Sequence, residues 1–567
     1  MKKTITRREF IAGGGKVAML ASVAGSSLFL KGCSTGKDYD FVLKGGLVYD
    51  GLGNPGRAAD VGISGATVKT IGKIPASRGV VVLDVSGLAV SPGFIDVHDH
   101  SDLCLLANPK AESAVRQGVT TTISGQCGSS PFPIADAVLE DAREGAKAVY
   151  GVELTWRDLP GFFERLTQGG IAYNYATLVG HGAVRATAMG LDDRAPSPEE
   201  LERMKALVAE AMRQGALGMS SGLGYTPGSF AQPAELIELN KVVASLSGVY
   251  ATHMRSEGDG VLDSIDETLE TAKAAGVSVQ ISHLKAAYPG NWDKIEAMIA
   301  RIEAARAAGV NVNCDRYTYI ASSTGLDSLF PDWVRQGTSA DIVARLKDPK
   351  QEAKLRAALD RYEERIGSWD RVLISAVVTE KNRGVEGSSI LEASKAAGKP
   401  PFEFVRDLLV EENDQVGMIN FTMKEENLKR FLAHPLVGVG SDGEARAPYG
   451  VLSRGKPHPR SYGTFARYLG KYAREEKVLP LETAIMKITS GVARKFGLEK
   501  RGTLAEGSFA DLVAFDPAKI IDRATWKDPH QYADGVVHVL VNGVPVIASG
   551  EHTGNLPGGI LKKVIPG

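Results

Sequence analysis

The sequence predicts an α/β protein built on a (β/α)8 barrel of the TIM type, and three observations favour this class. Eight short runs rich in apolar and β-branched residues recur between residues 93 and 443. Amphipathic helical patterns, such as those at 197–215 and 291–309, lie between several of these runs. Glycine or polar residues close each run. Strands that alternate with helices in this way are typical of a parallel sheet, and eight such units close into a barrel.

The eight expected strands share one property, which is that polar or glycine residues follow their apolar part. They cover residues 93–100, 119–127, 175–181, 216–223, 249–255, 277–285, 310–319 and 436–443. In barrels of this kind the residues that carry chemistry lie at the carboxyl ends of the strands. The polar residues that end these runs are therefore the candidate functional residues.

The two ends of the chain predict a second, smaller domain. Short strands joined by glycine turns occur both near the start and near the end of the chain. We expect residues 38–93 and 490–567 to form one small β-sandwich domain, and residues 94–489 to form the barrel. Residues 325–415, between the seventh and eighth strands, are too long for a simple connection. They contain charged helices and one more strand, so we expect an inserted α/β subdomain that acts as a lid.

Residues 1–33 are typical of a targeting leader rather than of a folded element. The adjacent Arg7 and Arg8 precede the modestly apolar run 17–30, which is too short to be a stable membrane span. This order predicts a Tat-type signal peptide and an exported, periplasmic protein. Cys33 in "LKGC" stands where a lipoprotein leader is cut and lipidated, which predicts anchoring to the membrane surface. Simple cleavage nearby is the alternative, and Lys31 is an unusual residue before a lipidation site.

Composition and charge exclude some classes of partner. The formal net charge is −1 and 23% of residues are charged, so nothing favours nucleic acid as a partner. The small-molecule ligand of an enzyme fits this composition better, and the oligomeric state is not predicted. After the leader the chain keeps Cys104, Cys127 and Cys314, an odd and sparse set that does not form a disulfide framework.

Imidazole, thiol and carboxylate groups gather at the expected strand ends. In chain order these residues are His98, His100, Cys127, His181, His253, His283 and Asp442. Each alone has an ordinary structural interpretation, and for His181 a hydrogen-bonded core histidine is as good a hypothesis as a functional one. Together they are of the kind that zinc prefers as ligands. The joint pattern therefore predicts a metal centre at the mouth of the barrel.

These residues lie in segments that resemble the amidohydrolase superfamily, and within it the D-aminoacylases (N-acyl-D-amino-acid deacylases). The segments are "SPGFIDVHDHSD", "GVTTTISGQCGSSPFP", "GHGAVR", "SSGLGYTPG", "ATHMRSEGDG", "ISHLKAA" and "PHPRSYGTFARYLG". The resemblance extends from about residue 40 to 560. It implies zinc-dependent hydrolysis of the amide bond of an N-acyl-D-amino acid, which releases a carboxylate and a D-amino acid.

The resemblance also implies roles for single residues. Cys127, His253 and His283 would hold one tightly bound zinc ion, with the cysteine in place of the modified lysine of many relatives. His98 and His100 would flank this ion and hold a second, weaker metal. Asp442 would act as general base and then as general acid.

Substrate and supporting roles follow from the same resemblance. Lys285 and Arg460 would bind the substrate α-carboxylate, and Tyr317, Ser322 and Tyr225 would add hydroxyl donors. Arg255 and Glu257 would support His253. Segment 443–459 is longer than the resemblance leads us to expect, which leaves the side-chain specificity open.

Three other functions remain open from the sequence. One is a cyclic amide hydrolase of the hydantoinase or dihydroorotase kind, although the fourth strand offers no lysine. Another is a dipeptidase-like amidohydrolase. The last is an anchored binding protein that keeps the barrel without catalysis, against which the full set of ligands and Asp442 argue.

Overall fold

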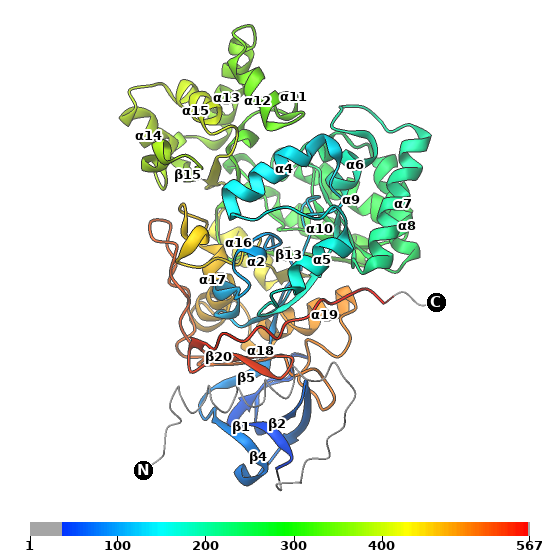
Figure 1. Cartoon of the computed structure of the whole chain (residues 1–567), viewed down its shortest axis with the longest axis vertical. Helices are drawn as coiled ribbons and strands as arrows, with labels where there is room; N and C mark the ends of the chain where they lie inside the picture. The colour runs from blue at the N-terminus through cyan, green and yellow to red at the C-terminus, as the bar shows by residue number, and fades with distance from the viewer. Residues whose placement is uncertain (1–36, 565–567) are drawn as a thin grey trace.

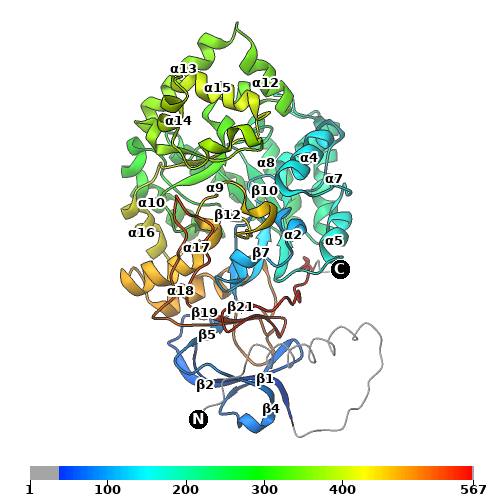
Figure 2. The ribbon, with the colours of Figure 1, turned by 60° about the vertical axis from the view of Figure 1, so that its left-hand side comes forward.

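A computed structural model describes residues 37–564, which form a β domain, a barrel and an insert stacked in that order (Figure 1). The β domain lies at one end, the insert at the other, and the barrel between them, an arrangement that Figure 2 shows from a second side. The expected leader at 1–33 lies outside the described residues. Among residues 37–564, no helix is long and apolar enough to cross a membrane.

Both ends of the chain build the β domain. Its strands are β1 (Tyr39–Val48), β2 (Arg57–Ser64), β3 (Thr67–Gly72), β4 (Gly79–Asp84), β5 (Ala89–Pro92), β18 (Leu512–Phe515), β19 (Val536–Val541), β20 (Val544–Ala548) and β21 (Glu551–His552). Hydrogen bonds join them into one nine-stranded sheet, in the order β21-β20-β19-β18-β5-β1-β2-β3 with β4 also on β1. The strands of the expected β-sandwich domain are thus connected into a single hydrogen-bonded sheet. The reason is that β1 pairs with β4 along its first half and with β5 along its second, after a register shift between Leu43 and Gly46.

The C-terminal boundary of the β domain also differs from the expected one. Residues 490–496, placed in the β domain by the sequence, form helix α19 (Ser490–Phe496). Val492 and Phe496 of this helix pack against Ile95, Ile123 and other side chains of the barrel strands. At the other end, Gly558 N donates to Ile171 O, so the final described segment leaves the sheet and follows the barrel.

The barrel contains a parallel strand at each of the eight expected positions. They are β6 (Phe94–Asp96), β7 (Val119–Ser124), β8 (Asn174–Thr177) continued by β9 (Val179–Gly180), β10 (Gly218–Gly222), β11 (Val249–His253), β12 (Ser278–Ile281), β13 (Val312–Arg316) and β17 (Val437–Val439). Pairing runs β6-β7-β8 and β9-β10-β11-β12-β13-β17, all parallel. The first and last strands meet where His100 N donates to Gly443 O and Asp442 N donates to His98 O, both at 2.8 Å. The barrel is therefore closed.

Helices surround the barrel and follow its strands. They are α2 (Cys104–Ala107), α3 (Glu112–Val115), α4 (Leu139–Gly145), α5 (Leu159–Thr167), α6 (His181–Met189), α7 (Pro198–Gln214), α8 (Pro233–Ser245), α9 (Val261–Ala275), α10 (Ile295–Ala307), α16 (Glu425–Ala433), α17 (Arg460–Arg467) and α18 (Leu481–Lys487). Helix α7 shows why such segments are helical. Ser197 and Glu200 form a capping box, Pro198 opens the first turn, and Met204 and Val208 lie one turn apart on the buried face.

The insert between β13 and β17 has its own hydrophobic core, in which residues from Leu326 to Met418 pack together. Its helices are α11 (Asp332–Arg335), α12 (Ser339–Lys347), α13 (Glu352–Ile366), α14 (Ile390–Ala396) and α15 (Pro401–Glu411). Its antiparallel sheet pairs β14 (Ser322–Gly325) and β15 (Val372–Ala376) with the central β16 (Gly417–Asn420). The sheet thus extends beyond the expected 325–415 at both ends.

Candidate metal centre and active site

A sulfur atom lies at the centre of the candidate site. Cys127 follows β7, and its Sγ lies 3.4 Å from Nε2 of His98 and 3.4 Å from Nε2 of His283. One donor atom from each of these three residues and one from Asp442 lie within 4.8 Å of one another. Four groups from strands one, two, six and eight of the barrel therefore converge on one small volume.

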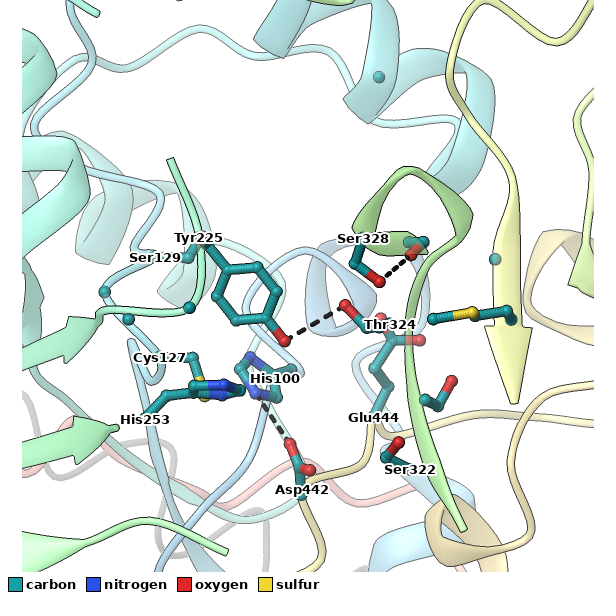
Figure 3. Close-up of a pocket in the computed structure, with 18 of the residues that line it drawn as sticks. His100, Cys127, Ser129, Tyr225, His253, Ser322, Thr324, Ser328, Asp442 and Glu444 are labelled. Carbon is teal, nitrogen blue, oxygen red and sulfur yellow. Dashed lines mark hydrogen bonds and ion pairs between the residues drawn. The ribbon is translucent and has the colours of Figure 1, made fainter. Parts of the chain in front are cut away.

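A second group of donors adjoins the first and shares His283 with it. His253, Glu257 and His283 also offer atoms that lie within 4.8 Å of one another. His283 Nδ1 is 2.8 Å from the Glu257 carboxylate, and the rings of His253 and His283 are centred 4.6 Å apart. His100 joins from the other side, where its Nε2 is 3.2 Å from Asp442 Oδ1 (Figure 3). The five residues assigned to metal from the sequence therefore lie together.

The backbone around these residues takes an unusual form. Cys127, His283 and Asp442 all have positive φ, at 54°, 35° and 51°. Positive φ costs free energy for residues other than glycine, and it persists where the surrounding structure holds it. Here it occurs directly after β7, β12 and β17, where each strand turns away and leaves its last side chain over the barrel.

The charges in the site favour an ionised sulfur and an ionised base. Burial alone would raise the pKa of the Cys127 thiol, but His98 and His283 lower it well below its usual value. Burial would likewise raise the pKa of Asp442, whereas Arg460 and His283 hold it well below the usual range. The same charges raise the pKa of His98 and of His283. Metal binding would release these protons and leave a thiolate beside neutral imidazoles.

The donor set fits zinc. Tetrahedral zinc with sulfur at about 2.3 Å and nitrogen at about 2.0–2.1 Å places those two ligand atoms about 3.5 Å apart. The two distances of 3.4 Å between Cys127 Sγ and the histidine nitrogens match this spacing. Thiolate and imidazole also favour zinc, because magnesium and calcium prefer oxygen ligands such as carboxylate, carbonyl and water.

Asp315, at the end of β13, is a site residue that the sequence analysis missed. Its Oδ1 lies 3.3 Å from His98 Nδ1 and accepts a hydrogen bond from His283 N at 2.7 Å. Gln280 Nε2 donates to its other oxygen. A carboxylate on the outer nitrogen of a metal-binding histidine fixes its tautomer and ring orientation. The sequence feature that could have identified Asp315 is the presence of a carboxylate within the seventh expected strand, at 310–319.

The two cations expected to bind a substrate carboxylate line the cavity, and both already have acidic partners. Lys285 contacts Glu257, and its Nζ also lies 2.8 Å from His283 Nδ1. Arg460 Nη1 donates to Asp442 Oδ2 at 2.6 Å. Glu257 therefore connects Lys285 to the histidines, while Arg460 contacts the candidate base directly.

The expected hydroxyl donors divide into two kinds. Tyr225 and Ser322 line the cavity, and the Tyr225 hydroxyl accepts a hydrogen bond from Thr324 at 3.2 Å (Figure 3). Tyr317 is fully buried and outside the cavity lining, and its hydroxyl lies 4.0 Å from the Met423 sulfur. The structure therefore places the Tyr317 hydroxyl away from the cavity in which the sequence predicted a substrate contact. Its ring instead packs beneath Arg460, whose guanidinium carbon is 4.9 Å from the ring centre.

His181 and Arg255 have structural partners. His181 Nε2 lies 2.8 Å from Glu235, and Arg185 donates to the same carboxylate at 2.6 Å. His181 is outside both donor groups, as the core-histidine interpretation requires. Arg255 pairs with Glu267 and donates to Ser229 O and Ala231 O, which fixes the segment after β11.

A cavity of about 1310 Å³ opens above the donor groups. Barrel residues such as His100 and Lys285 line its floor, and insert residues such as Thr324 and Val416 line its other side. The insert therefore covers part of the mouth of the barrel. A substrate can enter this cavity and reach the metal donors at its base.

Comparisons with known proteins identify relatives along nearly the whole chain. The sequence model of the amidohydrolase family matches residues 81–547. The chain is 36% identical over 524 residues to N-acyl-D-glutamate deacylase of Alcaligenes xylosoxydans xylosoxydans, which covers 92% of this chain and 96% of that protein. It is 35% identical over 534 residues to D-aminoacylase of the same organism, with 94% and 99% covered.

Solved structures agree with the sequence comparison. N-acyl-D-glutamate deacylase from Bordetella bronchiseptica, complexed with zinc and a phosphonate inhibitor, matches with a TM-score of 0.78 and 33% identity, covering 93% of this chain and all of that one. D-hydantoinase from Thermus sp. matches with a TM-score of 0.52 at 15% identity, covering 92% and 99%. The second likeness concerns the fold alone.

Proposed function

Because the chain belongs to the amidohydrolase family and is a hydrolase of N-acyl amino acids, we propose that it cleaves N-acyl-D-amino acids with the help of zinc. The convergence of Cys127, His98, His283 and Asp442 on one volume is the observation that carries this proposal. Relatives named as N-acyl-D-amino-acid deacylases, at 35–36% identity over most of the chain, support the substrate class.

Cys127, His253 and His283 would hold the principal ion, and His98 and His100 a second, weaker one. His283 belongs to both groups of donors, because it lies with Cys127 and His98 on one side and with His253 and Glu257 on the other. When bound, zinc polarises an amide carbonyl and makes water a nucleophile near neutral pH. Asp315 keeps His98 oriented through its 3.3 Å contact. Glu257 holds His283 from the other side of the ring.

Asp442 is the proposed proton carrier of the reaction. Its carboxylate takes a proton from the attacking water as the oxygen adds to the acyl carbon. It then gives this proton to the amide nitrogen as the C–N bond breaks, which leaves a carboxylate and a D-amino acid. Arg460 keeps Asp442 ionised before the reaction, because the two side chains are 2.6 Å apart and buried.

The substrate α-carboxylate is proposed to bind between Lys285 and Arg460. Both side chains line the cavity, and a guanidinium fork suits a carboxylate. Tyr225 and Ser322 add hydroxyl groups on the insert side.

The substitution Asp442→Asn tests this function directly. The variant is expected to keep the principal zinc ion, measured by elemental analysis, and to lose at least about a hundredfold in kcat on an N-acyl-D-amino acid, since removing one essential proton carrier typically costs about 10²–10⁴-fold. Normal turnover by the metal-loaded variant would refute the role. A panel of N-acyl-D- and N-acyl-L-amino acids, tested beside hydantoins, separates deacylation from cyclic amide hydrolysis. The likeness to D-hydantoinase concerns the fold alone.

We also propose that the protein is exported by the Tat route to the periplasm and is lipidated at Cys33. The support is the order of Arg7, Arg8, the apolar run and the "LKGC" segment. Replacing both arginines with lysine should leave the protein in the cytoplasmic fraction. Cys33→Ser should move it from the membrane to the soluble periplasmic fraction, and no change in either fractionation would contradict the proposal.

A further inference from the structure

We infer that the substrate carries a long apolar acyl chain, which binds in a chamber between the segment 138–149 and the insert. This inference rests on the proposed function and adds the class of acyl group. The chamber is the part of the cavity lined by Val138, Ala142, Ala146 and Val149 on one wall and by Val416 and Met418 on the other. The term acyl chamber is used below for these six residues.

One face of a helical segment forms the first wall. Residues 138, 141, 142, 145, 146 and 149 line the cavity, a spacing of three and four residues that marks one side of a helix. Glu140, Arg143, Glu144 and Lys147 lie on the exposed side. Helix α4 buries none of its residues against a protein core. Its apolar face is therefore directed at the open cavity, where an apolar ligand would remove it from water.

The second wall belongs to the insert, and one contact connects it to the first. Val416 precedes β16 and Met418 is its second residue. Both are almost fully buried because they belong to the hydrophobic core of the insert, so only their edges face the cavity. Asp141, the charged member of the cavity-facing positions, accepts a hydrogen bond from Ser339 N at 3.0 Å. Ser339 begins α12 of the insert, so this carboxylate connects the two walls. Asp414, next to Val416, also lines the cavity, so the apolar surface has an acidic border on this side. In Figure 1, α4 lies across the top of the barrel directly below the insert.

The cavity is larger than a short acyl group needs. Pockets for drug-sized ligands measure about 300–1,000 Å³, and an N-acetyl amino acid is smaller than such ligands. The cavity measures about 1310 Å³. An N-acetyl substrate bound at the metal donors would leave the part of the cavity beside segment 138–149 unfilled.

The direction of the substrate favours the acyl chain as occupant. In an extended N-acyl amino acid the scissile carbonyl lies between the acyl chain and the α-carboxylate. Of the two proposed carboxylate ligands, Lys285 follows strand six of the barrel and Arg460 follows strand eight, whereas segment 138–149 follows strand two. The metal donors lie between them. A carboxylate at Lys285 and a carbonyl at the donors therefore direct the acyl chain toward segment 138–149.

A chain-length series on the zinc-loaded protein tests this inference. N-acetyl, N-hexanoyl and N-decanoyl derivatives of one D-amino acid are compared by kcat/KM. Burial of each added methylene predicts a rise of about fourfold until the chamber is full. Ala142→Phe fills the chamber, and we expect it to lower kcat/KM at least tenfold for the decanoyl substrate and less than threefold for the acetyl one. Ala137→Phe adds the same ring at an exposed position and should change neither value.

Binding of decanoate, which is the acyl product, gives a readout that needs no turnover. Calorimetry should show binding to the zinc-loaded protein that Ala142→Phe weakens at least tenfold and Ala137→Phe does not. Equal kcat/KM for all chain lengths would contradict the acyl chamber and leave the proposed deacylation unaffected. Decanoate binding that Ala142→Phe does not weaken would do the same. Decanoate binding without release of any D-amino acid would instead overturn the proposed function and keep the chamber.

Discussion

Gly222, the last residue of β10, lies so close to Cys127 that a Cβ at this glycine would be 2.0 Å from the Cys127 carbonyl oxygen. The backbone that carries the candidate zinc ligand from strand two is therefore seated on the end of strand four. A side chain at this place on strand four has no room. The position of Cys127 after strand two therefore requires a glycine at the end of strand four.

Gly222→Ala should displace Cys127 and weaken zinc binding. Because backbone atoms rather than a flexible side chain lie 2.0 Å away, the segment at 127 has to move. We expect at least a tenfold loss of zinc affinity, measured by competition with a chromogenic chelator. Gly72→Ala is the matched control, since nothing lies within 4 Å of a Cβ there. Equal zinc affinity of the two variants would show that the contact does not position the ligand.

Asp315→Asn should weaken the centre through His98. Asparagine keeps one acceptor oxygen but loses the charge that orients the His98 ring at 3.3 Å. Such changes behind a metal ligand typically cost about 10–100-fold in metal affinity or activity. Titration of zinc against kcat measures both effects. Asp136→Asn, at an exposed position, controls for the loss of one negative charge, and a similar result for both variants would argue against a positioning role.

Glu235→Gln should destabilise the fold and leave zinc affinity unchanged. Glu235 accepts from both His181 and Arg185, and all three are buried. Removing one member of a buried ion pair leaves an uncompensated charge and typically costs about 3–5 kcal/mol. Thermal or chemical unfolding measures this loss. Glu140→Gln breaks an exposed pair with Arg143 and should cost less than about 1 kcal/mol. A loss of zinc by Glu235→Gln without a change in stability would instead favour a functional role for His181 at the metal centre.

Much of the barrel and of the candidate site could be predicted from the sequence because both depend on local patterns. Apolar runs with polar ends mark strands, and side chains at parallel strand ends meet at one edge, so His98, Cys127, His283 and Asp442 lie together. Strand β14 (Ser322–Gly325) was not predicted, because serine, threonine and glycine carry little strand signal. Its form depends on long-range pairing with β16.

The direction of single side chains was harder to predict. Tyr317 lies just beyond β13 near the site, yet its hydroxyl is directed at Met423 and away from the cavity. Asp315, two residues earlier, reaches His98 instead. Proximity in sequence to a strand end therefore selects candidate residues but not which of them faces the substrate.

X-ray absorption at the zinc edge tests the central claim most directly, which is that Cys127 and histidines share one zinc ion. The zinc-loaded protein should show one sulfur scatterer at about 2.3 Å beside nitrogen and oxygen at about 2.0–2.1 Å. Cys127→Ser should lose the sulfur contribution. A spectrum without sulfur, unchanged in Cys127→Ser, would contradict this centre.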